Sequence, residues 1–232
     1  MGDIKLPVFD VAGTTAKDDG LVVKAFVSAA ISQGIACNSE PMHNAIEYVE
    51  KTMGQRKIDV FKHIFEGDLA KAEAAHERFI TAYLELIQQG ELEEFSGISD
   101  LFSTLKLRGI GVAITTGFPR EILDLIIESL NWSNLVDYSV AASEVSNGRP
   151  DPEMILRCID QYNFSNGTSI VAGDIAVIGD TVSDIQSGIN AGARFVVGIN
   201  SGTHTSQALI GAGATHILAA TTELLTSVNF LD

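Results

Sequence analysis

Three acidic residues follow short apolar runs, at places where buried strands would end. Asp10 follows the run of residues 4–9, and Asp180 and Asp184 follow the run of residues 177–179. A carboxylate at the carboxyl end of a buried strand lies where open α/β sheets bind their ligands. There it can act as a nucleophile or as a ligand to a hard metal ion. Taken singly, each of these residues could equally serve the start of the following helix.

Two further segments carry groups that can bind an anion. Residues 112–116 form another apolar run, which ends in a hydroxyl at Thr116 and is followed by Gly117. Arg149 lies in a predicted turn before Pro150. A hydroxyl and a backbone amide can donate hydrogen bonds, and a guanidinium adds a positive charge. Each has a structural explanation as a helix cap or a solvated turn residue, but the order of the four segments favours one shared site.

Two kinds of region would position these residues. One is a core of strands, and the other is a helical segment inserted into it. Residues 17–95 carry almost no strand signal, and their periodicity predicts helices. These helices are expected at residues 21–35, 39–52, 57–66 and 69–89. Apolar runs elsewhere predict parallel strands with crossover helices. These runs lie at residues 4–9, 112–116, 136–140, 177–179, 194–198 and 216–219. We expect an α/β fold with a doubly wound, Rossmann-like core at residues 1–16 and 96–232, and an α-helical cap at residues 17–95.

Composition limits the classes of partner. The chain has 232 residues and a net charge of −15, and this sign argues against nucleic acid. No apolar run approaches the roughly 20 residues of a membrane span, and no basic stretch with a long apolar region opens the chain. Cys37 and Cys158 show no disulfide framework or metal-site spacing. We expect a cytoplasmic monomer or homodimer, in which local cations offset the negative charge around any anionic substrate.

In this order, the four segments resemble the motifs of the haloacid dehalogenase superfamily. The resemblance is to its phosphonoacetaldehyde hydrolase (phosphonatase)-like branch, and it spans nearly the whole chain. It rests on residues 10–15, 116–117, 148–150 and 179–184. It implies a Mg²⁺-dependent hydrolase of a small phosphorylated or phosphonate metabolite. The Asp10 carboxylate would attack phosphorus and form an aspartyl-phosphate.

The resemblance also implies a role for each site residue. Thr116 and Gly117 would bind phosphoryl oxygens, and Arg149 would neutralise charge on the transferring group and orient the nucleophile. Asp184 would bind the metal through water or hold its ligands in place. The direct ligands of Mg²⁺ would be Asp10, the backbone carbonyl of Ala12, and Asp180.

Position 12 departs from typical phosphatases of the superfamily, which carry a second Asp there as general acid. Ala12 cannot donate a proton. Phosphonatases instead use a cap lysine that forms a Schiff base with the substrate aldehyde, and Lys57 in residues 53–59 matches that lysine. Two departures favour a phosphate monoester phosphatase without a Schiff base. Val60 stands where phosphonatases have a histidine, and Phe118 where they have a tyrosine.

Two other functions stay open. A haloacid dehalogenase would attack carbon with the same Asp10, but such enzymes lack the acidic loop that Asp180 and Asp184 represent. A non-enzymatic phosphate-binding protein would be expected to lose site residues, whereas this chain retains Asp10, Thr116, Arg149 and Asp180.

The cap residues that would set specificity are not identified by periodicity. Phe61 and Phe65 are predicted to pack inside the cap rather than to line the site. His63 lies one helical turn after Val60 and could replace the missing histidine. A position on the cap surface is the simpler prediction for it.

Overall fold

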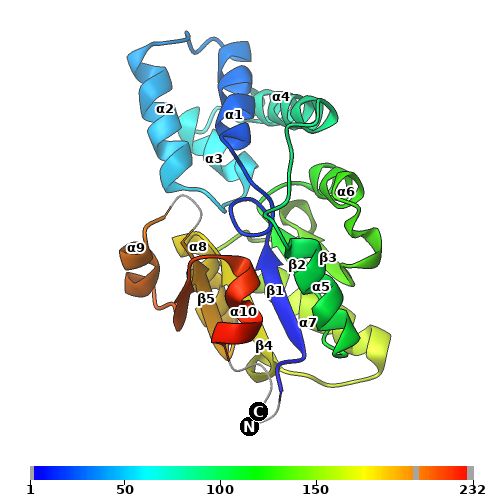
Figure 1. Cartoon of the computed structure of the whole chain (residues 1–232). Coiled ribbons are helices and arrows are strands. Elements are labelled where there is room, and N and C mark those ends of the chain that lie inside the picture. Colours follow the sequence, from blue (N-terminus) through cyan, green and yellow to red (C-terminus); the bar gives the residue numbers. More distant parts are fainter. Residues whose placement is uncertain (1–2, 201–203, 229–232) are drawn as a thin grey trace.

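The computed structural model describes residues 3–200 and 204–228 and contains one parallel six-stranded sheet (Figure 1). Its strands are β1 (Leu6–Asp10), β2 (Ala113–Thr116), β3 (Tyr138–Ala141), β4 (Ile175–Gly179), β5 (Phe195–Ile199) and β6 (His216–Leu218). Their order in the sheet is β3-β2-β1-β4-β5-β6. The chain therefore runs outward from β1 to β3 and then returns to the other side of β1. The reversal between β1 and β4 is where sheets of this type bind ligands.

Helices cover both faces of the sheet, which buries all of β1 and β4. Alternate residues of β1 face opposite layers: Phe9 joins the cluster on one face, and Leu6 and Val8 join the cluster on the other. The first face is covered by α5 (Ile98–Leu107), α6 (Arg120–Ser129) and α10 (Leu224–Ser227). The second is covered by α7 (Glu153–Asn166), α8 (Val182–Ala191) and α9 (Ser206–Gly211). The prediction of a doubly wound α/β core is confirmed.

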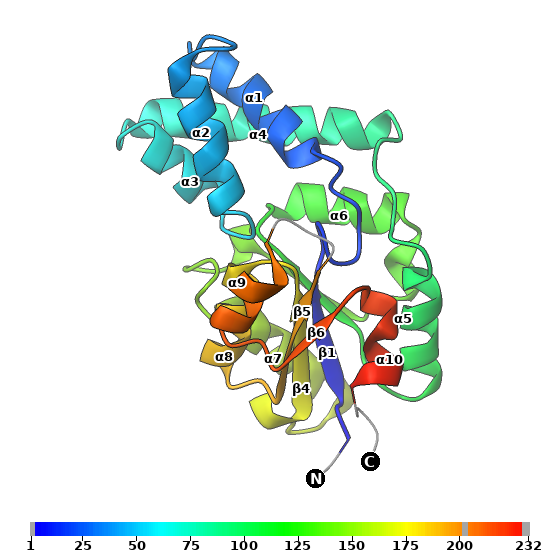
Figure 2. The ribbon, with the colours of Figure 1, turned by 60° about the vertical axis from the view of Figure 1, so that its left-hand side comes forward.

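Four helices lie between β1 and α5 in the chain and above the carboxyl edge of the sheet (Figure 2). They are α1 (Leu21–Ser32), α2 (Glu40–Lys51), α3 (Lys57–Ile64) and α4 (Leu69–Gln88). All four fall within the predicted helical ranges and end slightly earlier than predicted. Two of them begin at side-chain caps, where Ser39 accepts from the Met42 amide and Asp68 from the Lys71 amide.

Aromatic rings form the interior of this helical group. Phe61 is buried, with Phe65 and Phe79 at centroid distances of 6.4 and 6.0 Å. His63 is exposed and stacks on Tyr48, with centroids 3.9 Å apart. Neither Phe61 nor Phe65 is among the described residues that line the cavity below. The predictions that both phenylalanines pack inside the cap and that His63 lies on its surface are confirmed.

The two connections between the sheet layer and the helical group are hydrogen-bonded to each other. The Lys17 amide donates to the Glu93 carbonyl at 2.8 Å, and the Phe95 amide donates to the Thr15 carbonyl at 3.0 Å. This pairing falls at the expected borders of the cap, although the division into separate domains stays a prediction. Within the described residues, no helix combines the length and apolarity that crossing a membrane requires.

Candidate active site

Asp10, the last residue of β1, is paired with the buried Arg149. Its Oδ1 accepts a hydrogen bond from Arg149 Nη1 at 2.5 Å, and Arg149 Nη2 donates to Thr115 Oγ1 at 2.6 Å. Asp10 is 6% exposed and Arg149 5%. Burial raises the pKa of Asp10 to about 7, repulsion by Asp184 adds to this, and Arg149 opposes it. The guanidinium therefore favours the carboxylate form that a nucleophile requires.

Asp180 and Asp184 lie beside Asp10 because β4 neighbours β1 in the sheet. Ligand oxygens of the three carboxylates lie within 4.8 Å of one another. Thr14 Oγ1 donates to Asp180 Oδ1 at 3.0 Å. Like charges buried this closely repel each other, so a cation among them would be strongly stabilised. An all-oxygen donor set of this kind fits Mg²⁺.

Asp184 serves both the helix start and the carboxylate cluster. Its Oδ2 accepts from Thr181 Oγ1 at 2.6 Å and from the Thr181 amide at 3.1 Å, which forms a capping box at the start of α8. Its buried Oδ1 has no hydrogen bond to any described residue but lies 2.7 Å from Arg149 Nη1 as an ion pair. An unsatisfied buried oxygen fits a metal ion or metal-bound water. Asp184 therefore caps the start of α8 and lies in the carboxylate cluster, and its role toward a metal stays a prediction.

The chain makes a tight turn after β1, which brings its backbone against the carboxylate cluster. The Ala16 amide donates to the Val11 carbonyl at 2.9 Å. Gly13 has a φ of 86°, and a Cβ there would lie 2.3 Å from Asp180 Oδ2. Only glycine tolerates both the positive φ and this close approach. The turn places Ala12 in the wall of the cavity, next to the predicted metal site.

Thr116 ends β2 on the other side of β1 and Gly117 follows it, and both line the cavity. Thr116 is buried, and its Oγ1 accepts from the Phe118 amide at 3.3 Å. A Cβ at Gly117 would lie 2.6 Å from the Gln55 carbonyl oxygen and 2.8 Å from that of Gly54. Glycine at this position lets the cap backbone lie directly on the core beside the predicted phosphoryl site.

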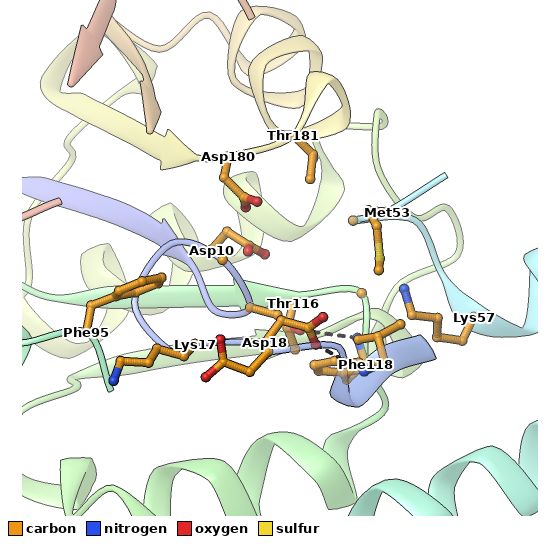
Figure 3. A pocket seen from close by; sticks show the side chains of 16 residues that line it. Asp10, Lys17, Asp18, Met53, Lys57, Phe95, Thr116, Phe118, Asp180 and Thr181 are labelled. Atoms are coloured by element: carbon orange, nitrogen blue, oxygen red, sulfur yellow. Dashed lines mark hydrogen bonds between the residues drawn. The ribbon is translucent and has the colours of Figure 1, made fainter. Parts of the chain in front are cut away.

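A cavity of about 290 Å³ lies between the strand ends and the cap. Figure 3 shows Asp10, Thr116 and Asp180 on the core side, and Met53 and Lys57 on the segment that comes from the cap. The structure thus brings together at one cavity the predicted nucleophile, phosphoryl-binding groups, metal ligands and cap lysine. Arg149 and Asp184 lie behind them, in contact with each other.

Lys57, the first residue of α3, is 6% exposed and lines the cavity. Among the described residues, its one hydrogen bond is a long one to the Gln55 carbonyl, at 3.5 Å. Its Nζ also lies 5.6 Å from the centre of the Phe118 ring. Burial lowers the pKa of Lys57 to about 8, while Asp18 and then Asp10 act in the opposite direction. The amine is therefore far easier to deprotonate than that of a solvated lysine.

Sequence reasoning did not identify Asp18 as a residue of the cavity. It is half-buried, lines the cavity, and accepts from the Val22 amide at 3.1 Å through Oδ1. Burial raises the pKa of Asp18, and the charge of Lys57 is among the effects that oppose this rise. An acidic residue just before an apolar helix indicates a helix start. That signal places Asp18 at α1 but does not reveal its interaction with a lysine from α3.

Residues 8–197 match the family described as haloacid dehalogenase-like hydrolase. The chain belongs to this hydrolase family. Its relatives include a phosphonoacetaldehyde hydrolase of Bacillus mycoides (strain KBAB4), 29% identical over 223 residues that cover 86% of this chain and 77% of the relative. Another phosphonoacetaldehyde hydrolase, from Bacteroides fragilis (strain YCH46), is 29% identical over 216 residues, covering 82% and 74% of the two chains.

Solved structures agree with this hydrolase fold. A predicted phosphatase from Clostridium acetobutylicum has a TM-score of 0.81 at 19% identity, covering 99% of this chain and 100% of that chain. A phosphonoacetaldehyde hydrolase-like protein from Oleispira antarctica has a TM-score of 0.79 at 19% identity, covering 97% and 91%. At this level of sequence identity, the structural similarity shows the fold but does not show the substrate.

Proposed function

We propose that this hydrolase cleaves the carbon–phosphorus bond of phosphonoacetaldehyde, with Asp10 as nucleophile, Lys57 as Schiff-base residue and Mg²⁺ as cofactor. The observation that carries the proposal is the shared cavity: a carboxylate and a pKa-lowered amine line it from opposite sides. Position 12 supplies no acid for an alkoxide leaving group. The names of the two curated relatives support the same substrate.

Lys57 would act first, as a nucleophile toward the aldehyde. With a pKa of about 8, about a tenth of the amine is neutral at pH 7, against about one part in three thousand for an unperturbed lysine. The neutral amine adds to the carbonyl carbon, and loss of water from the adduct leaves a protonated imine on Nζ. This cation is the electron acceptor that the next step requires.

Asp10 would then attack phosphorus. The carbon–phosphorus bond breaks, its electron pair enters the imine to form an enamine, and the phosphoryl group stays on the carboxylate. The leaving carbon needs no proton at that moment, so Ala12 is sufficient. Thr116, the Gly117 amide and Arg149 would hold the phosphoryl oxygens. Mg²⁺, held by the predicted ligands, would reduce the repulsion between the anionic substrate and the carboxylate when bound.

Water would complete both halves of the reaction. It hydrolyses the aspartyl-phosphate to phosphate and regenerates Asp10. The enamine takes a proton on carbon, and water then releases acetaldehyde and frees the amine of Lys57. The sum is one water consumed for each phosphonoacetaldehyde converted to acetaldehyde and phosphate. A cavity of about 290 Å³ suits so small a substrate.

The test is turnover of phosphonoacetaldehyde with Mg²⁺, measuring acetaldehyde and phosphate together. Lys57→Arg keeps a positive charge but has no accessible neutral form, so we expect it to lose acetaldehyde release. Borohydride should trap a covalent adduct on Lys57 in the wild type and in the control, and none in Lys57→Arg. Lys62→Arg, a half-buried lysine on the same helix that does not line the described part of the cavity, is the matched control. Wild-type acetaldehyde release by Lys57→Arg would exclude the Schiff base.

A phosphate monoester phosphatase is the second candidate, and the wall of the cavity favours it in one respect. Phe118 brings a ring without a hydroxyl to the cavity, and neither Val60 nor His63 is among the described residues that line it. The same assay with a panel of phosphate monoesters separates the two functions. Phosphate from a monoester without acetaldehyde from phosphonoacetaldehyde would make Lys57 a specificity residue only.

A further inference from the structure

The cap segment of residues 53–57 lies directly on two loops of the core. A Cβ at Gly54 would lie 2.7 Å from Thr181 Oγ1. A Cβ at Gly148 would lie 2.9 Å from Arg56 Cβ. Glycine on each side therefore permits an approach closer than ordinary side chains allow. The cap segment that carries Lys57 is thus packed against the core loop that precedes Arg149.

Arg56 makes hydrogen bonds across this contact. Its Nη1 donates to the Ser146 carbonyl at 3.1 Å and, more weakly, to the Val145 carbonyl at 3.4 Å. Its Nε and Nη2 donate to the two carboxylate oxygens of Asp59, at 2.7 and 3.2 Å. The planar guanidinium can serve both partners at once because its donors point in fixed directions. Asp59 thereby holds the arginine in the orientation that reaches the core.

The core side of this contact is itself held in place. Glu153 Oε2, in the first turn of α7, accepts from the amides of Ser146 and Asn147 at 2.9 and 3.2 Å. The same loop continues into Arg149, whose guanidinium contacts Asp10. Arg56 therefore binds a loop that is anchored at α7 and that carries the partner of the proposed nucleophile.

Of the described residues, those that line the cavity do not include Arg56. Its position is therefore beside the cavity and not in the described part of its wall. It joins two chain segments: one carries Lys57 as the next residue, and the other carries Arg149. Because the hydrogen bond of Lys57 to Gln55 is long, the position of its amine depends mainly on how this segment is held.

We propose that Arg56 is a positioning residue that fastens the cap to core residues 145–149, so that Lys57 and Asp10 face one substrate together. The kinetic consequence rests on the function proposed above, whereas the fastening itself does not. A reaction that uses two groups on one small molecule depends steeply on their separation. A surface ion pair between Arg56 and Asp59 without this role would contribute little.

The experiment compares Arg56→Ala with Arg78→Ala in the full chain. Arg78 is a matched control, because its bonds to Ser28 and Glu85 stay within the cap. We expect Arg56→Ala to lower kcat for phosphonoacetaldehyde roughly 10- to 100-fold. Two partial reactions should stay within about two-fold of wild type, since each uses one side of the cavity. These are borohydride trapping of acetaldehyde on Lys57 and phosphorylation of Asp10 by acetyl phosphate.

A second measurement tests the fastening without reference to any substrate. Amide hydrogen exchange should become faster at residues 53–57 and 143–149 in Arg56→Ala, and stay unchanged there in Arg78→Ala. Arg56→Lys should restore part of the protection, because a lysine keeps one charged donor. If the wild type does not turn over phosphonoacetaldehyde, the proposed function fails while exchange still decides the fastening.

Three results would overturn the proposal. The first is unchanged exchange at both segments in Arg56→Ala. The second is unchanged kcat in that variant when the wild type is active on phosphonoacetaldehyde. The third is an equal loss of turnover and of both partial reactions together with a lower Tm, which would indicate general destabilisation instead of positioning.

Discussion

The two walls of the cavity hold their charged groups in different ways. On the core wall, Arg149 contacts both Asp10 and Asp184, and Asp180 accepts from Thr14. On the cap wall, Lys57 has a long hydrogen bond and a pKa of about 8. The core groups are ordered by mutual contacts, whereas the cap amine is tuned mainly by loss of solvent. Under the proposed function, the core wall would carry out the chemistry on phosphorus, and the cap wall would bind and activate the aldehyde.

The sharpest test of this division is removal of the core nucleophile. Asp10→Asn keeps the size of the side chain but removes its charge, so turnover should fall by about 10⁴-fold or more. The loss should be equal for carbon–phosphorus and phosphate ester substrates, since both would use the core wall. Asp124→Asn, an exposed change on α6, should keep full turnover. Activity retained by Asp10→Asn on either substrate would exclude Asp10 as the nucleophile, and with it the role given to the core wall.

Metal removal should also affect every substrate. A chelator should abolish turnover, and Mg²⁺ should restore it. Asp180→Asn should raise the Mg²⁺ concentration for half-maximal activity roughly 10- to 100-fold, because one charged ligand of the cluster is lost. Mg²⁺ should raise the Tm of the wild type more than that of this variant. Full activity after chelation would instead favour chemistry in which the carboxylate attacks carbon.

The contact between the two walls can be disturbed by a substitution that changes no charged residue. Gly117→Ala would place a Cβ 2.6 Å from the Gln55 carbonyl oxygen, so the cap segment has to move. We expect a destabilisation of about 1–3 kcal/mol, measured by denaturant unfolding, and a larger fall in kcat/KM for phosphonoacetaldehyde than for acetyl phosphate. Gly211→Ala is the control, because no atom lies within 4 Å of its added Cβ. Equal losses on both substrates would argue against separate roles for the walls.

The smallest expected effect is a shift in pH dependence. Only the neutral amine of Lys57 reacts, so kcat/KM for phosphonoacetaldehyde should rise with pH through about 8. Asp18 favours the charged amine, so Asp18→Asn should lower the pKa of Lys57 and move the midpoint to lower pH. Asn keeps an acceptor for the Val22 amide, which preserves the start of α1. A midpoint that stays in place or moves upward would contradict the proposed interaction.

Local patterns were sufficient to predict much of the fold and part of the site. Asp10 and Asp180 follow apolar runs that end as strands, and Ser39 begins a helix where its hydroxyl caps an amide. The contacts of Asp184 were predicted only in part. Its capping box is visible in sequence as Thr181 three residues earlier, but the ion pair of its Oδ1 with Arg149 joins residues far apart in the chain.

The amino-acid sequence by itself determined the elements, the strand ends and the residue types available for chemistry, because periodicity and caps act over a few neighbouring residues. Only the tertiary structure decided which of these groups meet. Sheet order brought Asp180 next to Asp10, and packing of the cap on the core brought Lys57 to the same cavity and Arg56 to the Ser146 carbonyl. Such contacts join residues far apart in the chain, so no local pattern contains them. The lowered pKa of Lys57 has the same origin, because it comes from the burial that this packing produces.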